Sequence, residues 1–509
     1  MLNFISWLDN FLNGTTMYRL VLYYLTALWV IALVLSFFGV LPYSPISLII
    51  SLIILFTISF ITNKSFAYFL KIPANVESIY ISVFILALIM PPAATYEQYF
   101  ILAQCGVFAM ASKYIIAPFH RHIFNPAALT AVLTTLLFGQ PATWWVGAFV
   151  MLPFVVLGGA VIIRKIKRVD LAVSFLAAAV LTAAIFGYFR GENIFDVLGT
   201  ALLYSPLFFF MSIMITEPQT TPPTRVSRIF YGALVGLFFS TPVSLGPLYF
   251  TPEIALLCGN IFSYLISFKK RLTLRLKEKR SLAPDAVEYI FQTNTPIDFK
   301  PGQYLEWTLG HEDVDIRGNR RYFTIASSPT EKELRLGIRF YENGSSFKKS
   351  LAKMNKGDVI FASQLCGDFV LPRNKEKKLV FIAGGIGVTP FRSMVKYLLD
   401  KNEKRDIVLL YSNKQKIDIA YKDIFDDASK ELGVKIVHTL TDPRDMEIGW
   451  TGRRGFIDSK MITEEVKDWK ERTFYISGPP SMVSSTKKVI RNLGLRRSQI
   501  KTDFFPGYV

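Results

Sequence analysis

The charged residues of this chain are divided very unequally between its two halves. Residues 1–268 contain 12 Lys and Arg and 8 Asp and Glu, whereas residues 269–509 contain 45 and 31. A chain that is 51% hydrophobic, with so few charges in its first half, does not have the surface of a plain soluble enzyme. The first half is therefore predicted to be a multi-span membrane domain and the second half a soluble, basic module. A disordered, collagen-like or disulfide-stapled chain is excluded.

The basic excess and the few cysteines restrict the partners further. The net charge of +18 could indicate a nucleic-acid partner. However, the basic residues flank apolar segments or lie among acids, without the interleaved aromatic residues of a nucleic-acid surface. We expect no nucleic-acid partner, and we expect the basic module to lie near anionic lipid instead.

The three cysteines form no C-x-x-C pair, so neither a zinc site nor an iron–sulfur cluster is predicted, and no metal site is expected.

Ten apolar segments of the first half are candidate membrane spans. They are 17–39, 46–62, 75–91, 98–117, 126–140, 143–163, 169–189, 197–215, 229–242 and 251–268. If the spans alternate in direction, all the Lys and Arg residues of this half except Arg190 fall on one side of the membrane. Positive loops face the cytoplasm, so both termini and the soluble half are expected there. The chain is predicted to be a multi-pass protein of the cell (inner or plasma) membrane, with the lipid bilayer as a partner.

Prolines interrupt the short spans at matching positions in two groups of five. Met90-Pro91-Pro92 corresponds to Thr216-Glu217-Pro218, and Asn125-Pro126-Ala127 corresponds to Thr251-Pro252-Glu253. Paired broken helices of this kind are typical of inverted repeats, in which helix termini surround a central site. The simpler alternative is that these prolines only mark helix ends, where they are tolerated.

The same segments resemble a known family. Leu86 through Pro92, Lys113, Phe124 through Ala128, and Met214 through Pro218 are similar to the D-type membrane subunit of Rnf electron-transport complexes. They are equally similar to the B-type membrane subunit of the sodium-translocating NADH:quinone reductase. That family carries flavins in the membrane, one of them attached to a threonine of an S-G-A-T segment. The segment is missing here, and Ala142-Thr143 matches it only superficially.

The resemblance implies a non-covalent flavin, FMN or riboflavin, near the cytoplasmic broken helices. Asn125, Thr216, Glu217 and Thr220 are the polar groups available to bind it, and Asn125, Thr216 and Glu217 are the residues assigned to the site. A carboxylate at the depth of Glu217 is a candidate functional group, because burying it without a partner is costly. The alternative is that Glu217 caps a helix or pairs with Arg225 or Arg228.

The second half predicts two further domains. Short alternating strands are expected at 273–279, 286–292, 303–309, 321–326, 334–341 and 358–363, with Pro-Gly, Asn-Gly and Lys-Gly turn signals between them. Six such strands predict a small antiparallel β-barrel. Apolar strands at 378–383, 406–411, 434–439 and 473–476 then alternate with helices, which is typical of an α/β parallel sheet. The expected domains are therefore 1–268, 269–374 and 375–509.

A glycine-rich turn follows the first strand of the parallel sheet. Gly384 through Pro390 reads G-G-I-G-V-T-P and leads into a helix, an arrangement that binds phosphate through backbone N–H groups and the helix dipole. Four other motifs accompany it in a fixed order: Arg321-Tyr322-Phe323-Thr324, Gly344-Ser345-Ser346, Gly478-Pro479-Pro480 and Asp503 through Tyr508. Together they resemble the ferredoxin–NADP reductase superfamily over about 240 residues.

This second resemblance implies FAD as a cofactor and NADPH or NADH as the electron donor. The Arg321 guanidinium would pair with the FAD phosphates, Phe323 would pack on the isoalloxazine edge, and the Thr324 hydroxyl would bond near N5. Phe505 would cover the flavin, Asp503 would pass protons, and Ser477 replaces the family's cysteine. The implied catalytic residues are Thr324, Ser477, Asp503 and Phe505. The implied cofactor-binding residues are Arg321, Tyr322, Phe323, Thr324, Gly344, Ser345, Ser346, Gly384, Gly385, Gly387, Thr389, Pro390, Gly478 and Pro479.

These inferences combine into one functional hypothesis. The chain is expected to be a membrane-bound NAD(P)H-oxidising flavoprotein, which passes electrons from NAD(P)H via FAD into a flavin-binding membrane domain and on to a quinone or an acceptor across the membrane. Lys414 and Lys416 follow the second parallel strand, where NADP-specific relatives bind the 2′-phosphate, which favours NADPH. The alternative is a transporter or channel regulated by a fused NAD(P)H:flavin reductase, and a third possibility is a plain membrane anchor. The sequence leaves the terminal acceptor, ion coupling and oligomeric state open.

Overall fold

The computed structural model of the chain contains two compact units, Met1–Arg271 and Leu272–Val509. It describes residues 12, 14–70, 76–118, 122–241, 244–245, 248–268, 270–293, 296–315, 317–442 and 450–503. Phe505, the predicted flavin cover, lies outside the described residues. The division into units falls close to the expected end of the membrane domain, and each unit is described by itself below.

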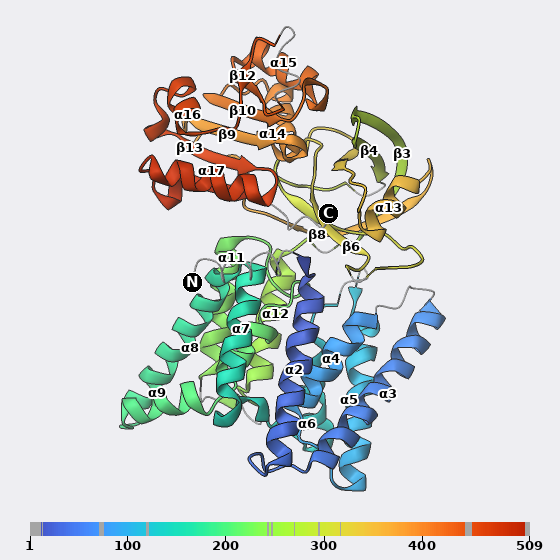
Figure 1. Ribbon diagram of the computed structural model, residues 1–509. Helices are drawn as coiled ribbons and strands as arrows, with labels where there is room; N and C mark the ends of the chain where they lie inside the picture. The colour runs from blue at the N-terminus through green and yellow to red at the C-terminus, as the bar shows by residue number, and fades with distance from the viewer. Residues whose placement is uncertain are drawn as a thin grey trace. The chain divides into compact units, whose positions relative to one another are not determined.

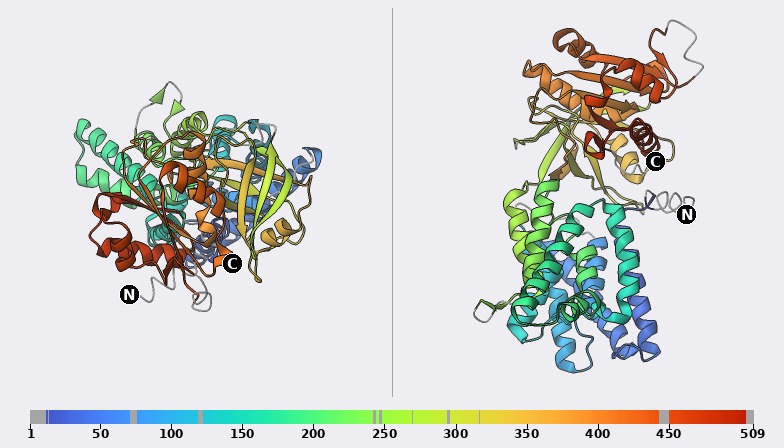
Figure 2. Two further views of the ribbon diagram at one scale, coloured as in Figure 1. Left: turned by 90° about the horizontal axis from the view of Figure 1, so that it is seen from above. Right: turned by 90° about the vertical axis from the view of Figure 1, so that its left-hand side faces the viewer.

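The first unit is built from helices that lie side by side (Figure 1, blue to green; Figure 2, right). They are α2 (Met17–Phe37), α3 (Pro45–Leu70), α4 (Val76–Ile89), α5 (Tyr96–Ile115), α6 (Pro126–Phe138), α7 (Leu152–Ile166), α8 (Val169–Phe189), α9 (Ile194–Leu203), α10 (Leu207–Phe209), the π-helical turn η4 (Phe210–Met214), α11 (Arg225–Phe239) and α12 (Pro252–Ile266). A short hairpin, β1 (Ser244–Leu245) with β2 (Leu248–Tyr249), separates the last two helices.

A helix lies in each of the ten expected spans, but their lengths differ. Among the described residues, four helical stretches are long and apolar enough to cross a membrane: Met17–Phe37, Pro45–Leu70, Phe149–Ile166 and Val169–Phe189. A fifth results if α9 and the helical segment Leu207–Met214 form one span bent by 55°. The apolar stretches Glu77–Ile89, Pro126–Phe138 and Pro252–Ile266 are shorter. The first unit is thus a helical region with four or five candidate spans, and the count of ten stays a prediction.

Two expected spans are not continuous helices. The stretch expected over 143–163 begins with two 3-10 turns, Trp145–Gly147 and Phe149–Met151, and α7 starts only at Leu152. The stretch expected over 197–215 breaks at Pro206, whose ring cannot continue a helix and which has no N–H to donate. The predicted helix starts at Asn-Pro and Thr-Pro are confirmed, because α6 begins at Pro126 and α12 at Pro252. Asn125 caps α6 by accepting the N–H groups of Ala127 and Ala128.

The second unit contains two sheets of six strands. The antiparallel sheet has the order β6-β5-β8-β3-β4-β7. Its strands are β3 (Leu272–Ala283), β4 (Ala286–Thr293), β5 (Tyr304–Thr308), β6 (Arg320–Thr324), β7 (Leu334–Arg339) and β8 (Val359–Cys366), with α13 (Ser346–Lys353) between the last two. All six expected strands are confirmed. Closure into a barrel stays a prediction, since β6 and β7 are the two edges of the sheet.

The parallel sheet has the order β12-β11-β10-β9-β13-β14. Its strands are β9 (Leu379–Gly384), β10 (Ile407–Asn413), β11 (Lys435–Leu440), β12 (Arg453–Arg454), β13 (Thr473–Ser477) and β14 (Ile500–Asp503). The helices that follow these strands are α14 (Thr389–Asp400), α15 (Lys422–Leu432), α16 (Ser459–Glu465) and α17 (Pro480–Asn492). β9 is buried throughout, as expected for a central parallel strand covered on both faces.

Candidate functional site

The candidate site lies at the carboxyl end of β9. This strand pairs with β10 on one side and with β13 on the other. The chain therefore leaves β9 where the strand order reverses, which is where parallel sheets bind ligands. Ser477 on β13 is the register partner of Ala383 on β9 and of Asp503 on β14. The loops that carry the predicted nicotinamide motifs consequently leave the sheet at one edge.

The glycine-rich turn after β9 lies directly against the loop after β13. Its residues form a 3-10 turn, Gly385–Val388, which runs into the first turn of α14. A Cβ placed on Gly387 would lie 2.5 Å from the Cα of Gly478, so no side chain fits between the two loops. This leaves bare backbone beside a helix N-terminus, the surroundings that a diphosphate needs. The residues predicted to hold the nicotinamide cofactor lie at the end of β9, on these two loops and in the first turn of α14: Gly384, Gly385, Gly387, Thr389, Pro390, Gly478 and Pro479.

Three of the predicted catalytic residues meet beside these loops. The Thr324 hydroxyl at the end of β6 donates to Oδ2 of Asp503 at the end of β14, at 3.4 Å. Asp503 is in turn the register partner of Ser477. All three side chains are nearly buried, with exposed fractions of 7% for Thr324, 9% for Asp503 and 4% for Ser477. The antiparallel and parallel sheets therefore contribute polar groups to one shared site.

The predicted FAD phosphate site surrounds the N-terminus of α13. Ser345 caps this helix by accepting the N–H of Lys348. The N–H of Ser346 donates to Oδ2 of Asp315 at 2.8 Å, and the Ser346 hydroxyl accepts the Asp315 N–H and contacts His311 Nε2, both at 3.0 Å. A carboxylate thus occupies the anion-binding end of α13, which shows that this end accepts negative charge.

Three cations lie around this helix end. The Arg317 guanidinium pairs with Asp315 at 2.8 Å, and Arg321 donates to the Arg317 carbonyl oxygen at 2.7 Å, with its guanidinium 5.4 Å from the Phe347 ring. Burial, and after it the charges of Arg321 and Arg317, lower the pKa of Lys348 to about 8. Asp315 supplies one negative charge beside these three cations, and the residues fit the diphosphate of FAD. Of Asp315, Arg317 and Lys348, none lies within a predicted motif; the signal available was the position of Lys348 just after Gly-Ser-Ser.

The remaining predicted flavin contacts alternate along β6. The Tyr322 hydroxyl lies 2.9 Å from Glu306 and 3.3 Å from Gln364, which fixes this side chain to the sheet. Phe323 points the other way and packs near Phe347, with 5.9 Å between ring centroids. Gly344 precedes α13, where its N–H donates to the Tyr341 carbonyl oxygen. The structure therefore divides β6 into a side held by the sheet and a side that faces α13.

In the first unit, the structure brings Asn125 and Glu217 together. Oε2 of Glu217 accepts from Asn125 Nδ2 at 3.0 Å and from the Thr220 hydroxyl at 3.1 Å, while Oε1 lies 3.3 Å from His122 Nε2. The Asn125 N–H donates to Asn260 on α12 at 2.8 Å. These partners account for both oxygens of Glu217, so the cluster by itself does not require a flavin.

The third predicted group of this membrane site does not join the cluster. The Thr216 hydroxyl donates to the Ser212 carbonyl oxygen at 2.7 Å, one helical turn earlier. The alternative partner considered for Glu217, Arg228, forms an ion pair with Asp170 at 2.9 Å. The polar groups near Glu217 thus come from the loop before α6 and from Thr220. Asn125 and Thr220 were predicted from the sequence, whereas His122 was not.

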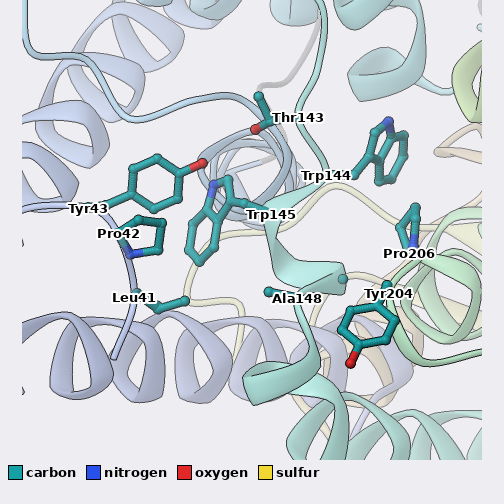
Figure 3. A pocket seen from close by; sticks show the side chains of 10 residues that line it. Leu41, Pro42, Tyr43, Thr143, Trp144, Trp145, Ala148, Tyr204 and Pro206 are labelled. Atoms are coloured by element: carbon teal, nitrogen blue, oxygen red, sulfur yellow. The ribbon is translucent and has the colours of Figure 1, made fainter. Parts of the chain in front are cut away.

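A cavity of about 290 Å³ lies near the other end of α6. It is lined by Leu41, Pro42, Tyr43, Thr143, Trp144, Trp145, Gly147, Ala148, Tyr204 and Pro206. Figure 3 shows the rings of Tyr43 and Trp145 side by side, with centroids 5.7 Å apart, and the Trp144 ring turned away from them. Trp144 Nε1 donates to the buried carboxylate of Glu253 at 3.0 Å. The 13 residues of α6 span about 20 Å, so this cavity and the Glu217 cluster lie at opposite ends of one helix.

Comparison with known proteins identifies the second half. Residues 381–488 match the family described as "Oxidoreductase NAD-binding domain". The chain is 24% identical over 219 residues to a flavohemoprotein of Halalkalibacterium halodurans, covering 41% of this chain and 52% of that protein. It is 28% identical over 235 residues to phenol hydroxylase P5 protein of Acinetobacter pittii, covering 45% and 64%. It is 29% identical over 234 residues to NADH-cytochrome b5 reductase 1 of Ajellomyces capsulatus, covering 44% and 74%.

Among solved structures, the cytochrome b5 reductase domain of Ulva prolifera nitrate reductase is 22% identical. The match covers 46% of this chain and 97% of that chain, with a TM-score of 0.42. The chain spans only about half to two thirds of the first curated relatives that it matches. The C-terminal half is a ferredoxin–NADP reductase-like FAD- and NAD-binding domain, homologous to NAD(P)H-dependent FAD oxidoreductases.

Proposed function

We propose that this chain is a membrane-bound NAD(P)H-oxidising flavoprotein, which passes electrons from NAD(P)H via FAD into its helical unit and on to a quinone or an acceptor across the membrane. The observation that carries the proposal is the meeting of Thr324, from the antiparallel sheet, with Asp503 and Ser477, from the parallel sheet. A hydride can pass between two cofactors only where their binding sites adjoin. The match of residues 381–488 to an oxidoreductase family supports the same reading.

Within this proposal, residues of the second unit hold FAD at its diphosphate and at its isoalloxazine ring. Arg317, Arg321, Lys348 and the N-terminus of α13 bind the diphosphate, and Asp315 gives up its hydrogen bond with Ser346 to it. FAD, when bound, accepts a hydride and releases electrons singly. The Thr324 hydroxyl directs its proton to Asp503 Oδ2, so its oxygen remains an acceptor for the ring system.

The parallel sheet supplies the second binding site. The bare backbone of Gly384 through Gly387 and the first turn of α14 bind the dinucleotide phosphates, with Thr389 and Pro390 starting that helix. Ser477 and Gly478 border the nicotinamide end. Asp503 holds or releases a proton at Oδ2 beside Thr324, which is the proton-handling role expected of it.

The proposal assigns the helical unit a ten-span inverted repeat in the cell membrane, with both termini and the reductase cytoplasmic. Four or five long apolar spans and the strong sidedness of Lys and Arg support this orientation. A non-covalent FMN or riboflavin near Asn125, Thr216 and Glu217 would accept the electrons within the helical unit. The corresponding domains are 1–268, 269–374 and 375–509.

Flavin analysis of the full-length protein in detergent tests the proposal. The purified chain is extracted and its flavins are separated by chromatography, which counts FAD and any FMN or riboflavin per chain. Anaerobic NADH and NADPH are then added while flavin absorbance is followed, with menaquinone analogues and ferricyanide as acceptors. We expect bleaching by at least one nucleotide and a second flavin in addition to FAD. A protein without flavin, or with a flavin that neither nucleotide bleaches, would overturn the proposal.

A second candidate function is a transporter or channel that the fused reductase regulates. It is favoured by charged groups buried in the helical unit. Lys113 Nζ lies 2.9–3.0 Å from Ser78 and Ser82 oxygens, and the Glu253 side chain is 3% exposed. Such groups inside a membrane domain often mark an ion path. Uptake of Na⁺ into proteoliposomes that depends on NADPH, without any quinone reduction, would favour this candidate.

A further inference from the structure

A buried arginine joins the two halves of the reductase unit. Arg392 lies on α14, and its side chain is 3% exposed. Its Nη1 donates to the Ala326 carbonyl oxygen at 3.1 Å and contacts Oε2 of Glu331, and its Nη2 donates to Oε1 of Glu331 at 2.9 Å. Both partners belong to the segment between β6 and β7. One guanidinium from the nicotinamide half is thus held by two groups of the flavin half.

The partners of Arg392 are themselves fixed. The Ala326 N–H donates to the Arg335 carbonyl oxygen at 2.8 Å. The Arg335 guanidinium pairs with Glu331 at 3.0 Å and with Glu288 on β4 at 2.7 Å. Glu331 and Glu288 are 12% and 4% exposed. The ion network therefore runs from α14 through the connecting segment into the antiparallel sheet, with little access to water.

Further contacts join the same two halves, from β7 as well as from α14. Arg339 on β7 pairs with Asp418, which follows β10, at 3.2 Å. The Ser393 hydroxyl, next to Arg392, donates to the Ser327 carbonyl oxygen at 2.7 Å. A Cβ on Gly337 of β7 would lie 2.7 Å from the Tyr421 hydroxyl and 2.8 Å from Cγ2 of Thr389. The backbone of β7 is therefore in direct contact with side chains of the nicotinamide half.

Arg392 and its partner Ala326 each lie close in sequence to one of the two cofactor sites. Thr389, which starts the nicotinamide-binding helix, lies three residues before Arg392, one turn along α14. Thr324, which faces Asp503, lies two residues before Ala326. Arg392 with its partners Ala326 and Glu331 is called the clamp below. Each site is connected to it by three residues of chain or fewer. A buried arginine–carboxylate pair is weak support for stability, because desolvation offsets the attraction, so a geometric role is the better account of it.

We propose that Arg392 is a positioning residue. By binding the Ala326 carbonyl oxygen and the Glu331 carboxylate, it sets the distance between the nicotinamide loop and Thr324 of the flavin half. This inference rests on the proposed function, because it concerns hydride transfer between the two sites. Releasing the clamp lets α14 shift relative to β6. A displacement of about 1 Å is enough to lower a transfer rate by up to 100-fold. The FAD diphosphate is held by Arg321 and α13, on the face of β6 that packs on Phe347, so we expect FAD to stay bound when the contacts of Arg392 are lost.

The test compares variants of Arg392 with those of a matched arginine in the full-length protein in detergent. Arg472 is also buried and also binds carboxylate, in its case Asp406 at 2.7 Å and Asp468 at 2.6 Å. All its partners lie at the amino end of the parallel sheet, within one half. Arg392→Gln, Arg392→Lys, Glu331→Gln and Arg472→Gln are measured for FAD content, melting temperature and anaerobic single-turnover flavin reduction at saturating nucleotide. Nicotinamide deuterated at C4 isolates the hydride step.

We expect Arg392→Gln to lower the rate of flavin reduction at least tenfold, with unchanged FAD content and a full isotope effect. Arg392→Lys should recover part of the rate, and adding Glu331→Gln to Arg392→Gln should produce no further loss. Arg472→Gln should lower the melting temperature but change the rate less than twofold. A rate within twofold of wild type in both Arg392→Lys and Glu331→Gln overturns the inference, as does an equal rate loss in Arg472→Gln. If wild type is bleached rapidly, those outcomes leave the proposed function intact; if wild type is not bleached, the proposed function itself is wrong.

Discussion

Thr324 and Asp503 lie on different sheets and 179 residues apart in sequence, yet Oγ1 of the threonine is 3.4 Å from Oδ2 of the aspartate. Each residue ends its strand, β6 in one case and β14 in the other. The carboxyl ends of the parallel strands therefore lie against β6, an outer strand of the antiparallel sheet. Both residues are nearly buried, which strengthens the hydrogen bond because little water competes for it.

Removing the Thr324 hydroxyl tests this contact. Thr324→Val keeps the shape but leaves the buried Asp503 carboxylate with one donor fewer, and it removes the group expected to bond the flavin. One such hydrogen bond contributes about 1–1.5 kcal/mol, so the rate of flavin reduction should fall roughly tenfold. Stopped-flow absorbance measures this rate. Thr324→Ser, which retains the hydroxyl, should stay within threefold of wild type, and equal rates for Val and wild type would contradict the assignment.

The glycine pair at the nicotinamide loop predicts a separate effect on nucleotide binding. Gly387→Ala places a Cβ 2.5 Å from the Gly478 Cα, and because the obstacle is backbone, one of the two loops must shift. We expect the KM for NADH and NADPH to rise at least tenfold while FAD content stays unchanged. Gly310→Ala is the matched control, since a Cβ there meets nothing within 4 Å. A simultaneous loss of FAD from Gly387→Ala would show that the loop is not specific to the nucleotide.

The cations around α13 predict a pH dependence of FAD affinity. The pKa of Lys348 lies at about 8, lowered by burial and then by Arg321 and Arg317, so the amine is charged at pH 7 and largely neutral at pH 9. Only the charged form attracts the diphosphate, so FAD binding takes up a proton above pH 8 and its Kd rises as the pH increases. Fluorescence quenching on adding FAD to deflavinated protein measures the Kd. The Kd should rise several-fold from pH 7 to pH 9 in wild type.

Two substitutions identify Lys348 as the titrating group. Lys348→Arg keeps a charge over this range, so the Kd should stay low and nearly independent of pH. Lys348→Met removes the charge, so the Kd should be high and equally independent of pH. A Kd that still rises in the Arg variant would assign the pH dependence to another group.

The strands and turns that form the site were predictable because their signals are local. The apolar strand before Gly384, the glycines after it and the Asn125-Pro126 start of α6 each encode their own conformation over a few residues. The breaks in the helices of the first unit were less predictable. Trp144 has a φ of +49° and leads into two 3-10 turns, in a segment whose composition predicts a continuous span. There, backbone hydrogen bonds from Thr143 and Trp144 to the Ile89 carbonyl oxygen replace helical ones.

Side-chain contacts between residues far apart in the sequence could not be predicted. Arg392 and Glu331 are separated by 61 residues, and neither belongs to a motif. Asp315 and Ser346 meet across 31 residues because the loop after β5 folds back over α13. Such pairs depend on how the folded helices, strands and loops pack against one another. A single sequence carries no periodic or compositional signal for this packing. The same holds for His122 beside Glu217, since the alternatives considered for the carboxylate were Arg225 and Arg228.

The Glu217 cluster allows the helical unit to be tested apart from the reductase. Glu217→Ala leaves Asn125 Nδ2 and the Thr220 hydroxyl without their shared acceptor, while the second unit keeps every contact of its cofactor sites. We expect NAD(P)H-dependent reduction of a menaquinone analogue to fall at least tenfold, and NAD(P)H-dependent ferricyanide reduction, which draws electrons from FAD directly, to stay within twofold. Glu192→Ala, at a side chain 46% exposed beside Arg190, is the control and should change neither activity. Equal losses of both activities in Glu217→Ala would assign the residue to the stability of the whole chain, whereas full quinone reduction would exclude it from the electron path.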